Sequence, residues 1–238
     1  LSDKLHDELT KSFIDKKISI LSRSLKQDLI LNTEINNENK IHIDGQLIGE
    51  LKALKFIIEM TSKTLDTDIK SIKKAARKGV EKELIKRVDE MLTKSEIKIN
   101  NESKIIWNNN AIARLKKGND YLNPDIDIIA DDSLNEESKT KLIVFLNKWL
   151  TNHINEELGD LIRLTKHKIS NQYLRGLMFQ LYEKNGVVKR SEVDKIVKSI
   201  PAEERKKLWG MGVKIGRYHI YLPKMLKPKA VEFRSGLW

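Results

Sequence analysis

The chain has 238 residues, of which 39% are hydrophobic and 33% are charged. This length is sufficient for one or two domains with a buried core. The absence of cysteine excludes disulfides, thiolate nucleophiles and cysteine zinc sites. No run approaches the roughly 18 uncharged apolar residues that a membrane helix needs, so we expect no membrane partner. The first residues, Leu1 to Lys4, include neither a methionine nor the apolar core of a signal peptide. We therefore expect a segment of a longer cytoplasmic protein.

The net charge of +11 is unevenly distributed. Residues 166–238 hold 17 Lys and Arg against 6 Asp and Glu, a net charge of +11, and the remaining 28 basic and 28 acidic residues of 1–165 cancel. A concentrated basic block attracts polyanions, and phosphate backbones are the usual ones. The excess therefore predicts a nucleic-acid partner, with a solvated surface or an acidic protein partner as the alternatives.

The first segment alternates between helical and strand patterns. Apolar residues three and four positions apart predict an amphipathic helix over Asp3–Leu31. Two short β-prone runs, Lys40–Ile43 and Gln46–Gly49, flank Asp44-Gly45, which is a strong hairpin signal. A further strand is predicted within Ala53–Met60.

A second helix, marked by apolar positions from Ile69 to Leu92, leads into a second copy of this pattern. Residues 35–52 and 99–116 align without a gap at an offset of 64 and share nine of 18 residues. We interpret this as an internal repeat of a long helix followed by a β-hairpin, with units at about 1–64 and 65–130. Chance similarity in an Asn- and Lys-rich sequence is the alternative. Whether the two hairpins form one sheet or two is left open.

The third segment begins with a turn at Tyr121–Pro124 and a predicted strand over Ile126–Ala130. Asp131-Asp132-Ser133 is a good N-cap group for a helix that runs to about Ile162. Trp149 lies on the apolar face of this helix and is expected to be a core anchor.

The basic block then predicts three helices and a strand. The first helix carries Tyr173 to Tyr182 and stops at Asn185-Gly186, before a short strand at Val187-Val188. The others are Glu192–Ser199, capped by Ser191, and a helix from Pro201 to about Trp209. The alternation over Val213–Pro223 predicts one strand. The fold class is therefore α+β and mostly helical, with a winged-helix-like order in a basic 131–238 domain that ends in a strand and a short helix.

Catalytic and metal signatures are absent from the sequence. No phosphate-binding P-loop and no Gly-x-Ser-x-Gly elbow occurs. The five histidines are scattered, and none forms a two-ligand pair at helical spacing. We therefore expect no catalysis, no metal and no cofactor in this chain.

Basic and aromatic residues interleave near the C-terminus in the way that a single-stranded nucleic acid requires. Basic side chains pair with phosphates, and aromatic rings stack on unpaired bases. Strand alternation places Arg217 and His219 on one face and Tyr218 on the other. The alternative is a buried strand whose aromatic residues, including Tyr221 and Phe233, belong to the core. The candidate contact residues are Arg175, Trp209, Lys214, Arg217, Tyr218, His219, Lys224, Lys227, Lys229 and Arg234.

The same segment resembles a known family. The resemblance rests on GVKIGRYHIYLP (Gly212–Pro223), Leu226–Pro228 and Leu237-Trp238, with weaker matches at Arg175–Leu181, Ile106-Trp107 and Ile112–Leu115. These residues resemble the C-terminal region of alphaproteobacterial superfamily 2 ATP-dependent helicases, which are similar to the mitochondrial RNA helicase of the degradosome. The resemblance implies upstream motor domains that bind ATP and Mg²⁺, none of whose motifs is present here.

We therefore predict a nucleic-acid-binding accessory region of a helicase, without the motor, that holds single-stranded DNA or RNA. The rival prediction is a protein-interaction module whose repeats dock a partner to the helicase. An exposed apolar patch on the repeat units, if present, would favour the rival.

Overall fold

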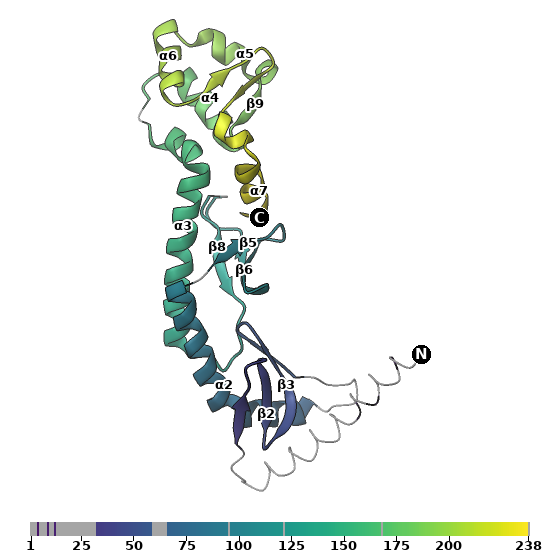
Figure 1. The fold of residues 1–238 in the computed structure, drawn as a ribbon. Helices are drawn as coiled ribbons and strands as arrows, with labels where there is room; N and C mark the ends of the chain where they lie inside the picture. The colour runs from purple at the N-terminus through teal and green to yellow at the C-terminus, as the bar shows by residue number, and fades with distance from the viewer. Residues whose placement is uncertain are drawn as a thin grey trace. The chain divides into compact units, whose positions relative to one another are not determined.

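The computed structural model describes residues 32–58, 66–94, 96–120, 122–167 and 169–237, together with Lys4, Leu9 and Ser12. Within these residues six α-helices accompany three small antiparallel sheets, so the predicted α+β class is confirmed (Figure 1). The helices are α2 (Asp66–Lys94), α3 (Glu136–Lys166), α4 (Gln172–Glu183), α5 (Arg190–Ser199), α6 (Ala202–Gly210) and α7 (Pro228–Leu237), with a 3₁₀ helix η1 (Pro223–Leu226). The strands are β1 (Thr33–Ile35), β2 (Lys40–Ile43), β3 (Gln46–Lys52), β4 (Lys55–Ile58), β5 (Ile97–Ile99), β6 (Lys104–Trp107), β7 (Asn110–Lys116), β8 (Asp125–Ile128), β9 (Val187–Lys189), β10 (Lys214–Ile215) and β11 (His219–Tyr221). Apart from Lys4, Leu9 and Ser12, the helix predicted over Asp3–Leu31 lies outside the described residues.

The chain folds into two compact units. Unit 1 consists of Leu1–Lys98, Lys104–Arg114 and Ile126–Phe145, and unit 2 of Ile99–Ser103, Leu115–Asp125 and Leu146–Trp238. The chain therefore passes between the two units several times. In the part that the structure describes, no helix has both the length and the apolar character needed to span a membrane.

The first sheet is a meander in the order β1-β2-β3-β4. Asp44 and Gly45 join β2 to β3 with φ values of 48° and 74°, as the tightest hairpin turns require. The predicted hairpin is therefore confirmed, and the strands that flank it complete the sheet.

The apolar face of this sheet packs on α2. The helix contributes Ile72, Ala76, Val80 and Leu84, all of which have no exposed area. Their spacing of four residues keeps them on the side of the helix that faces the sheet. The buried side chains of the sheet are Ile41, Ile43, Ile48, Leu51, Phe56 and Ile58.

The second sheet has the order β5-β6-β7-β8 and repeats the geometry of the first. Strands β5, β6 and β7 begin and end 64 residues after β1, β2 and β3. The irregularity between Ile41 and His42 also recurs 64 residues later, between Ile105 and Ile106. The two hairpins thus lie in separate sheets of the same design. A duplication as the origin of this design stays a prediction.

Arg87 of α2 ties the helix to the first sheet. Its guanidinium donates to the carbonyl oxygens of Leu51 and Ala53 at 3.1 and 2.8 Å, and to the side chain of Asn39. Glu83, one turn earlier on the helix, accepts from its Nε at 3.2 Å. Arg87 is 6% exposed, and these partners are what makes its burial tolerable.

Helix α3 starts later than predicted. The Asn135 side chain accepts the amide of Ser138 at 2.9 Å and caps the helix. The predicted cap was wrong: Asp131 instead accepts the amide of Ser133 in the preceding turn, and its carboxylate lies 3.6 Å from the Lys73 ammonium.

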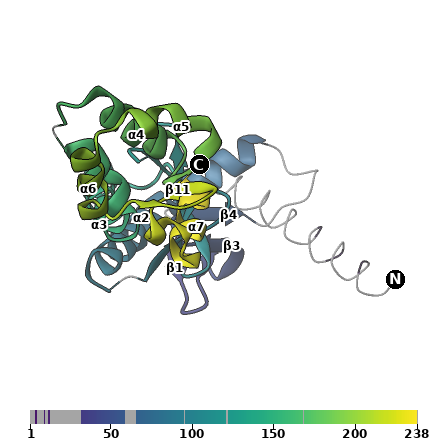
Figure 2. The ribbon, with the colours of Figure 1, turned by 90° about the horizontal axis from the view of Figure 1, so that it is seen from above.

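Residues 172–221 form a sub-structure of three helices and three short strands in unit 2 (Figures 1 and 2). The element order is α4-β9-α5-α6-β10-β11, and the sheet order is β10-β11-β9. The single strand predicted over Val213–Pro223 was wrong, because the chain reverses at Gly216–Tyr218. The predicted Ser191 cap was also wrong, because α5 begins at Arg190 without a side-chain cap.

The last helices are anchored within unit 2. Arg234 of α7 donates to the carbonyl oxygen of Asn185 at 2.8 Å. Near the end of α7, a Cβ on Gly236 would lie 2.7 Å from the carbonyl oxygen of Asn100. The helix therefore touches the backbone beside β5, where only glycine fits.

Candidate nucleic-acid interface

Helix α6 leads directly into the β10–β11 hairpin. Leu208 and Val213 are fully buried, and the Val213 amide donates to the Leu208 carbonyl oxygen at 2.9 Å. Gly212 makes the connection at a φ of 82°, a conformation that favours glycine. The end of α6 and the start of the hairpin are therefore fixed to one another.

Arg190 holds the turn of the hairpin. Its amide donates to the carbonyl oxygen of Tyr218 at 2.8 Å, and its guanidinium donates to that of Gly216 at 3.1 Å. A Cβ on Gly216 would lie 2.9 Å from the His219 carbonyl oxygen, so the turn is tight. These contacts present the turn residues at a defined place on the surface of the sub-structure formed by residues 172–221, which we call the module.

Three candidate residues gather at this turn and are all exposed. Tyr218 has 69% of its area exposed, and Arg217 and His219 are also exposed. The Arg217 guanidinium lies 5.4 Å from the centre of the Tyr218 ring, a cation–π distance. The predicted alternation, which placed Tyr218 on the opposite face, was wrong because these residues form the turn between two strands.

Two further candidates flank the turn. Lys214 of β10 is exposed, and Trp209, at the C-terminal end of α6, has 68% of its area exposed. An indole with this much exposure contributes little to the core. The hairpin and the end of α6 thus present three basic or aromatic side chains in addition to His219 and Tyr218.

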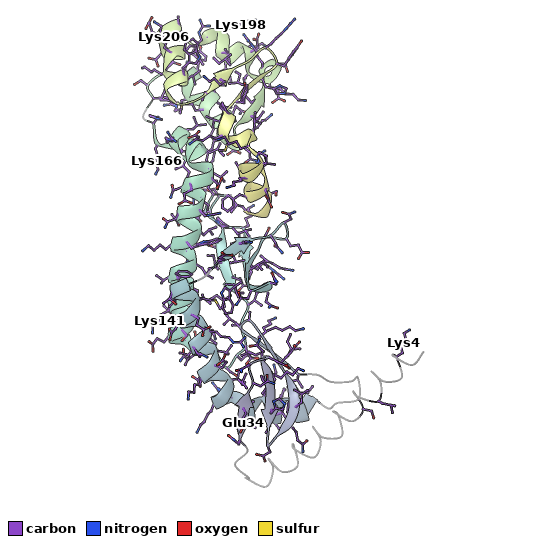
Figure 3. The ribbon with its side chains drawn as sticks, viewed as in Figure 1. Lys4, Glu34, Lys141, Lys166, Lys198 and Lys206 are labelled. Carbon is purple, nitrogen blue, oxygen red and sulfur yellow. The ribbon has the colours of Figure 1, made fainter. Side chains whose placement is uncertain are left out.

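Ion pairs occupy part of the charge on α6. Glu203 lies 3.1 Å from Lys206 and Glu204 lies 2.6 Å from Lys207. Figure 3 shows the labelled Lys206 side chain at the outer surface of the module. Arg205 is exposed and has no ion pair among the described residues. The sequence-based set missed Arg205, although the run of three basic residues at 205–207 marks it.

Three lysines of the candidate set face acidic residues instead. The Lys224 ammonium lies 3.6 Å from the Asp160 carboxylate, which also pairs with Arg163. Lys224, Lys227 and Lys229 line a shallow pocket of about 400 Å³ together with Glu156 and Glu157 of α3. These carboxylates reduce the potential that the three lysines present to a polyanion.

The remaining candidates lie elsewhere in unit 2. Arg175 is exposed on α4. Arg234 is half-buried and bonded to Asn185, which makes it a structural residue. Phe233 is 8% exposed and meets the ring of His153 edge-on at 4.8 Å. Phe233 therefore belongs to the core and cannot stack on a base.

The described residues contain no group of three or more His, Asp or Glu arranged to hold a metal ion.

The pKa of Tyr182 is strongly shifted from its ordinary value. Burial, together with the Asp120 carboxylate, raises the pKa of Tyr182 to about 12. This hydroxyl stays protonated at neutral pH, so it does not supply a nucleophile or a general base there.

Comparison of the chain with known protein families, with curated proteins and with solved structures finds no match.

Proposed function

We propose that this chain is a nucleic-acid-binding accessory region and that residues 172–221 of unit 2 contact the polymer through the β10–β11 hairpin and the end of α6. The observation that carries the proposal is the exposed cluster of Arg217, Tyr218, Lys214 and Trp209. It combines cations for phosphates with rings for unpaired bases. Residues 166–238, which include this cluster, have a net charge of +11, equal to that of the whole chain.

The element order of this module supports the proposal. Three helices and a three-stranded sheet follow in the order α4-β9-α5-α6-β10-β11. This is the element order expected of a winged helix, in which the β10–β11 hairpin would be the wing. In helix-turn-helix proteins the recognition helix enters the major groove with its N-terminal residues on the base edges. Here α6 would take that place.

The charges favour the wing over the start of α6. Glu203 and Glu204 occupy the first turn of α6 and pair with Lys206 and Lys207. Carboxylates at this point repel a phosphate backbone, because like charges raise the free energy of a contact. We infer that contact is made by the wing and the C-terminal end of α6, on single-stranded DNA or RNA.

The test is the affinity of the full chain for labelled single-stranded and duplex oligonucleotides over a salt series. Replacing Lys214 and Arg217 by Gln removes two charges from the wing, and the slope of log K against log salt should fall by roughly 1.5. A matched variant, Lys227→Gln with Lys229→Gln, removes the same charge beside Glu156 and Glu157 and should change the slope by less than half as much.

Tyr218→Ala separates stacking from charge. Tyr218→Ala should weaken the binding of a single strand by about 1–3 kcal/mol, the value of one stacked base, with no change in the salt slope. Equal affinity of the wing variants and the unmodified chain, with all of them folded, would contradict this site.

The rival function, protein docking, has little support in the exposed apolar residues that the structure describes in unit 1. Among its described residues, the large apolar side chains with substantial exposure are Leu9, Ile57, Ile143 and Val144. Scattered exposed apolar residues are normal on a monomer, whereas docking sites expose contiguous patches. The association with a helicase motor that binds ATP and Mg²⁺ stays a prediction from the sequence.

A further inference from the structure

Helix α2 in unit 1 carries a row of lysines that the charge balance of the sequence conceals. Residues 1–165 are neutral in total, yet the stretch from 70 to 82 holds six basic residues and one acidic residue, Glu81. All six basic side chains are exposed: Lys70, Lys73, Lys74, Arg77, Lys78 and Lys82. We call Lys70, Lys74, Lys78 and Lys82 the lysine row.

The spacing of the lysine row is four residues throughout, which is the spacing of neighbours on a helix surface. At 1.5 Å per residue, its members follow one another about every 6 Å and the row extends for about 18 Å. The side chains therefore form a line of positive charge that winds along the exposed side of α2, opposite the buried Ile72, Ala76 and Val80.

The lysine row lacks ion pairs within the part of unit 1 that the structure describes. Among the described residues, its four ammonium groups have no ion-pair partner, whereas the flanking Lys73 lies 3.6 Å from Asp131. The C-terminal part of α2 is different: Glu83 pairs with Arg87 at 3.2 Å, and Lys86 with Glu90 at 3.9 Å. Like charges four residues apart destabilise a helix. The row thus carries a cost in stability that a bound polyanion would relieve.

The surroundings of the row distinguish between polyanions. The apolar side of α2 is buried in the core of unit 1, and no large apolar side chain on the described part of α2 is among the exposed ones. A helix that lies in a lipid surface inserts an apolar face. A protein interface has a water-free centre that is poor in charged residues. Neither fits a row of lysines on a helix whose described part has no fully exposed large apolar side chain.

We propose that the lysine row is a second nucleic-acid-binding surface that takes the phosphate backbone without regard to base sequence. Lysine suits this task because its ammonium is a compact charge on a flexible stem that follows an irregular backbone. The surface lies in unit 1 and uses no residue of the wing, so the two can succeed or fail separately.

The experiment compares two variants of the full chain with equal changes in charge. In the first, Lys70, Lys74 and Lys78 become Gln. In the control, Lys52, Lys139 and Lys141 of the same unit become Gln, each of which pairs with a carboxylate at 2.5–2.7 Å. The affinity for oligonucleotides of two unrelated sequences is measured over a salt series. The lysine-row variant should lose about 2 to 3 from the salt slope equally for both sequences, and the control should lose less than 1.

Equal losses of salt slope in the two variants would overturn the proposal, because they would show a general effect of charge. No loss in either variant would overturn it as well. Vesicles of phosphatidylserine and of phosphatidylcholine form the second arm. If the lysine-row variant loses binding to phosphatidylserine while keeping its affinity for oligonucleotides, the row is a lipid-binding surface and the proposal fails. The Lys214→Gln, Arg217→Gln variant, measured in parallel, reports on the wing alone.

Discussion

At the scale of single residues, two helical glycines show how local space decides the sign of a substitution. A Cβ on Gly236 in α7 would lie 2.7 Å from the backbone oxygen of Asn100 and 2.8 Å from the Ile99 side chain, and backbone cannot move aside cheaply. Gly236→Ala should lower the free energy of unfolding by about 1–3 kcal/mol. A Cβ on Gly159 in α3 would meet nothing within 4 Å, so Gly159→Ala should raise it by about 0.5–1 kcal/mol.

Denaturant unfolding of both variants measures this difference. Their opposite signs guard against a general effect of alanine on helices, because both glycines are replaced by the same residue within a helix. A stabilising Gly236→Ala would mean that the end of α7 does not press against the chain beside β5.

Residue-level signals explain which exposed candidate residues could be predicted. Arg217, Tyr218 and Trp209 were identified because basic and aromatic residues alternate there, a pattern that needs no knowledge of the fold. Arg234 and Phe233 share that composition, but Asn185 and His153 engage them from segments distant in the sequence. No local pattern contains such contacts.

At the scale of elements, α2 stores electrostatic repulsion that can be measured without any ligand. Lys74 has Lys70 four residues before it and Lys78 four residues after it. Lys74→Glu replaces two repulsive pairs by two attractive ones, each worth about 0.2–0.5 kcal/mol. The free energy of unfolding should rise by about 1 kcal/mol at low salt, and the gain should shrink as salt screens the pairs.

The control for this prediction reverses the sign on α3. The Lys141 ammonium lies 2.6 Å from the carboxylate of Glu137, four residues earlier. Lys141 thereby lowers the pKa of the Glu137 carboxyl. Lys141→Glu turns the pair into a repulsion and should lower stability. A loss of stability in Lys74→Glu would show that the row contributes contacts of another kind.

The elements themselves were predictable where a pattern is local. The Asp44-Gly45 turn marked its hairpin, and the four-residue spacing of Ile72, Ala76 and Val80 marked α2. Strands of three residues, such as β1 and β5, are too short to show an alternation, and they exist because a neighbouring strand supplies their hydrogen bonds. The reversal at Gly216 was missed because Tyr218 and Ile220 continue an alternation through the turn.

At the scale of the whole molecule, the total charge is a poor guide to where a polyanion binds. The neutral sum over residues 1–165 conceals the lysine row, since carboxylates elsewhere in these residues balance it. The net charge of +11 overstates the positive potential at the surface of residues 166–238. Lys224 pairs with Asp160, and Lys227 and Lys229 line a pocket together with Glu156. Local pairing decides the potential that a ligand meets.

If the wing and the lysine row both bind one strand, their effects are linked by the length of that strand. Binding at one surface raises the effective concentration of the same strand at the other to the millimolar range. A strand long enough to reach both surfaces should therefore bind the unmodified chain roughly 10²-fold or more tightly than a short one. Either the lysine-row variant or the wing variant alone should reduce this dependence to the small increase expected from additional binding positions.

Anisotropy titrations with single strands of increasing length, at one salt concentration, measure how the affinity depends on strand length. An unchanged length dependence in both variants would mean that the two surfaces do not share a strand, even if each binds nucleic acid by itself.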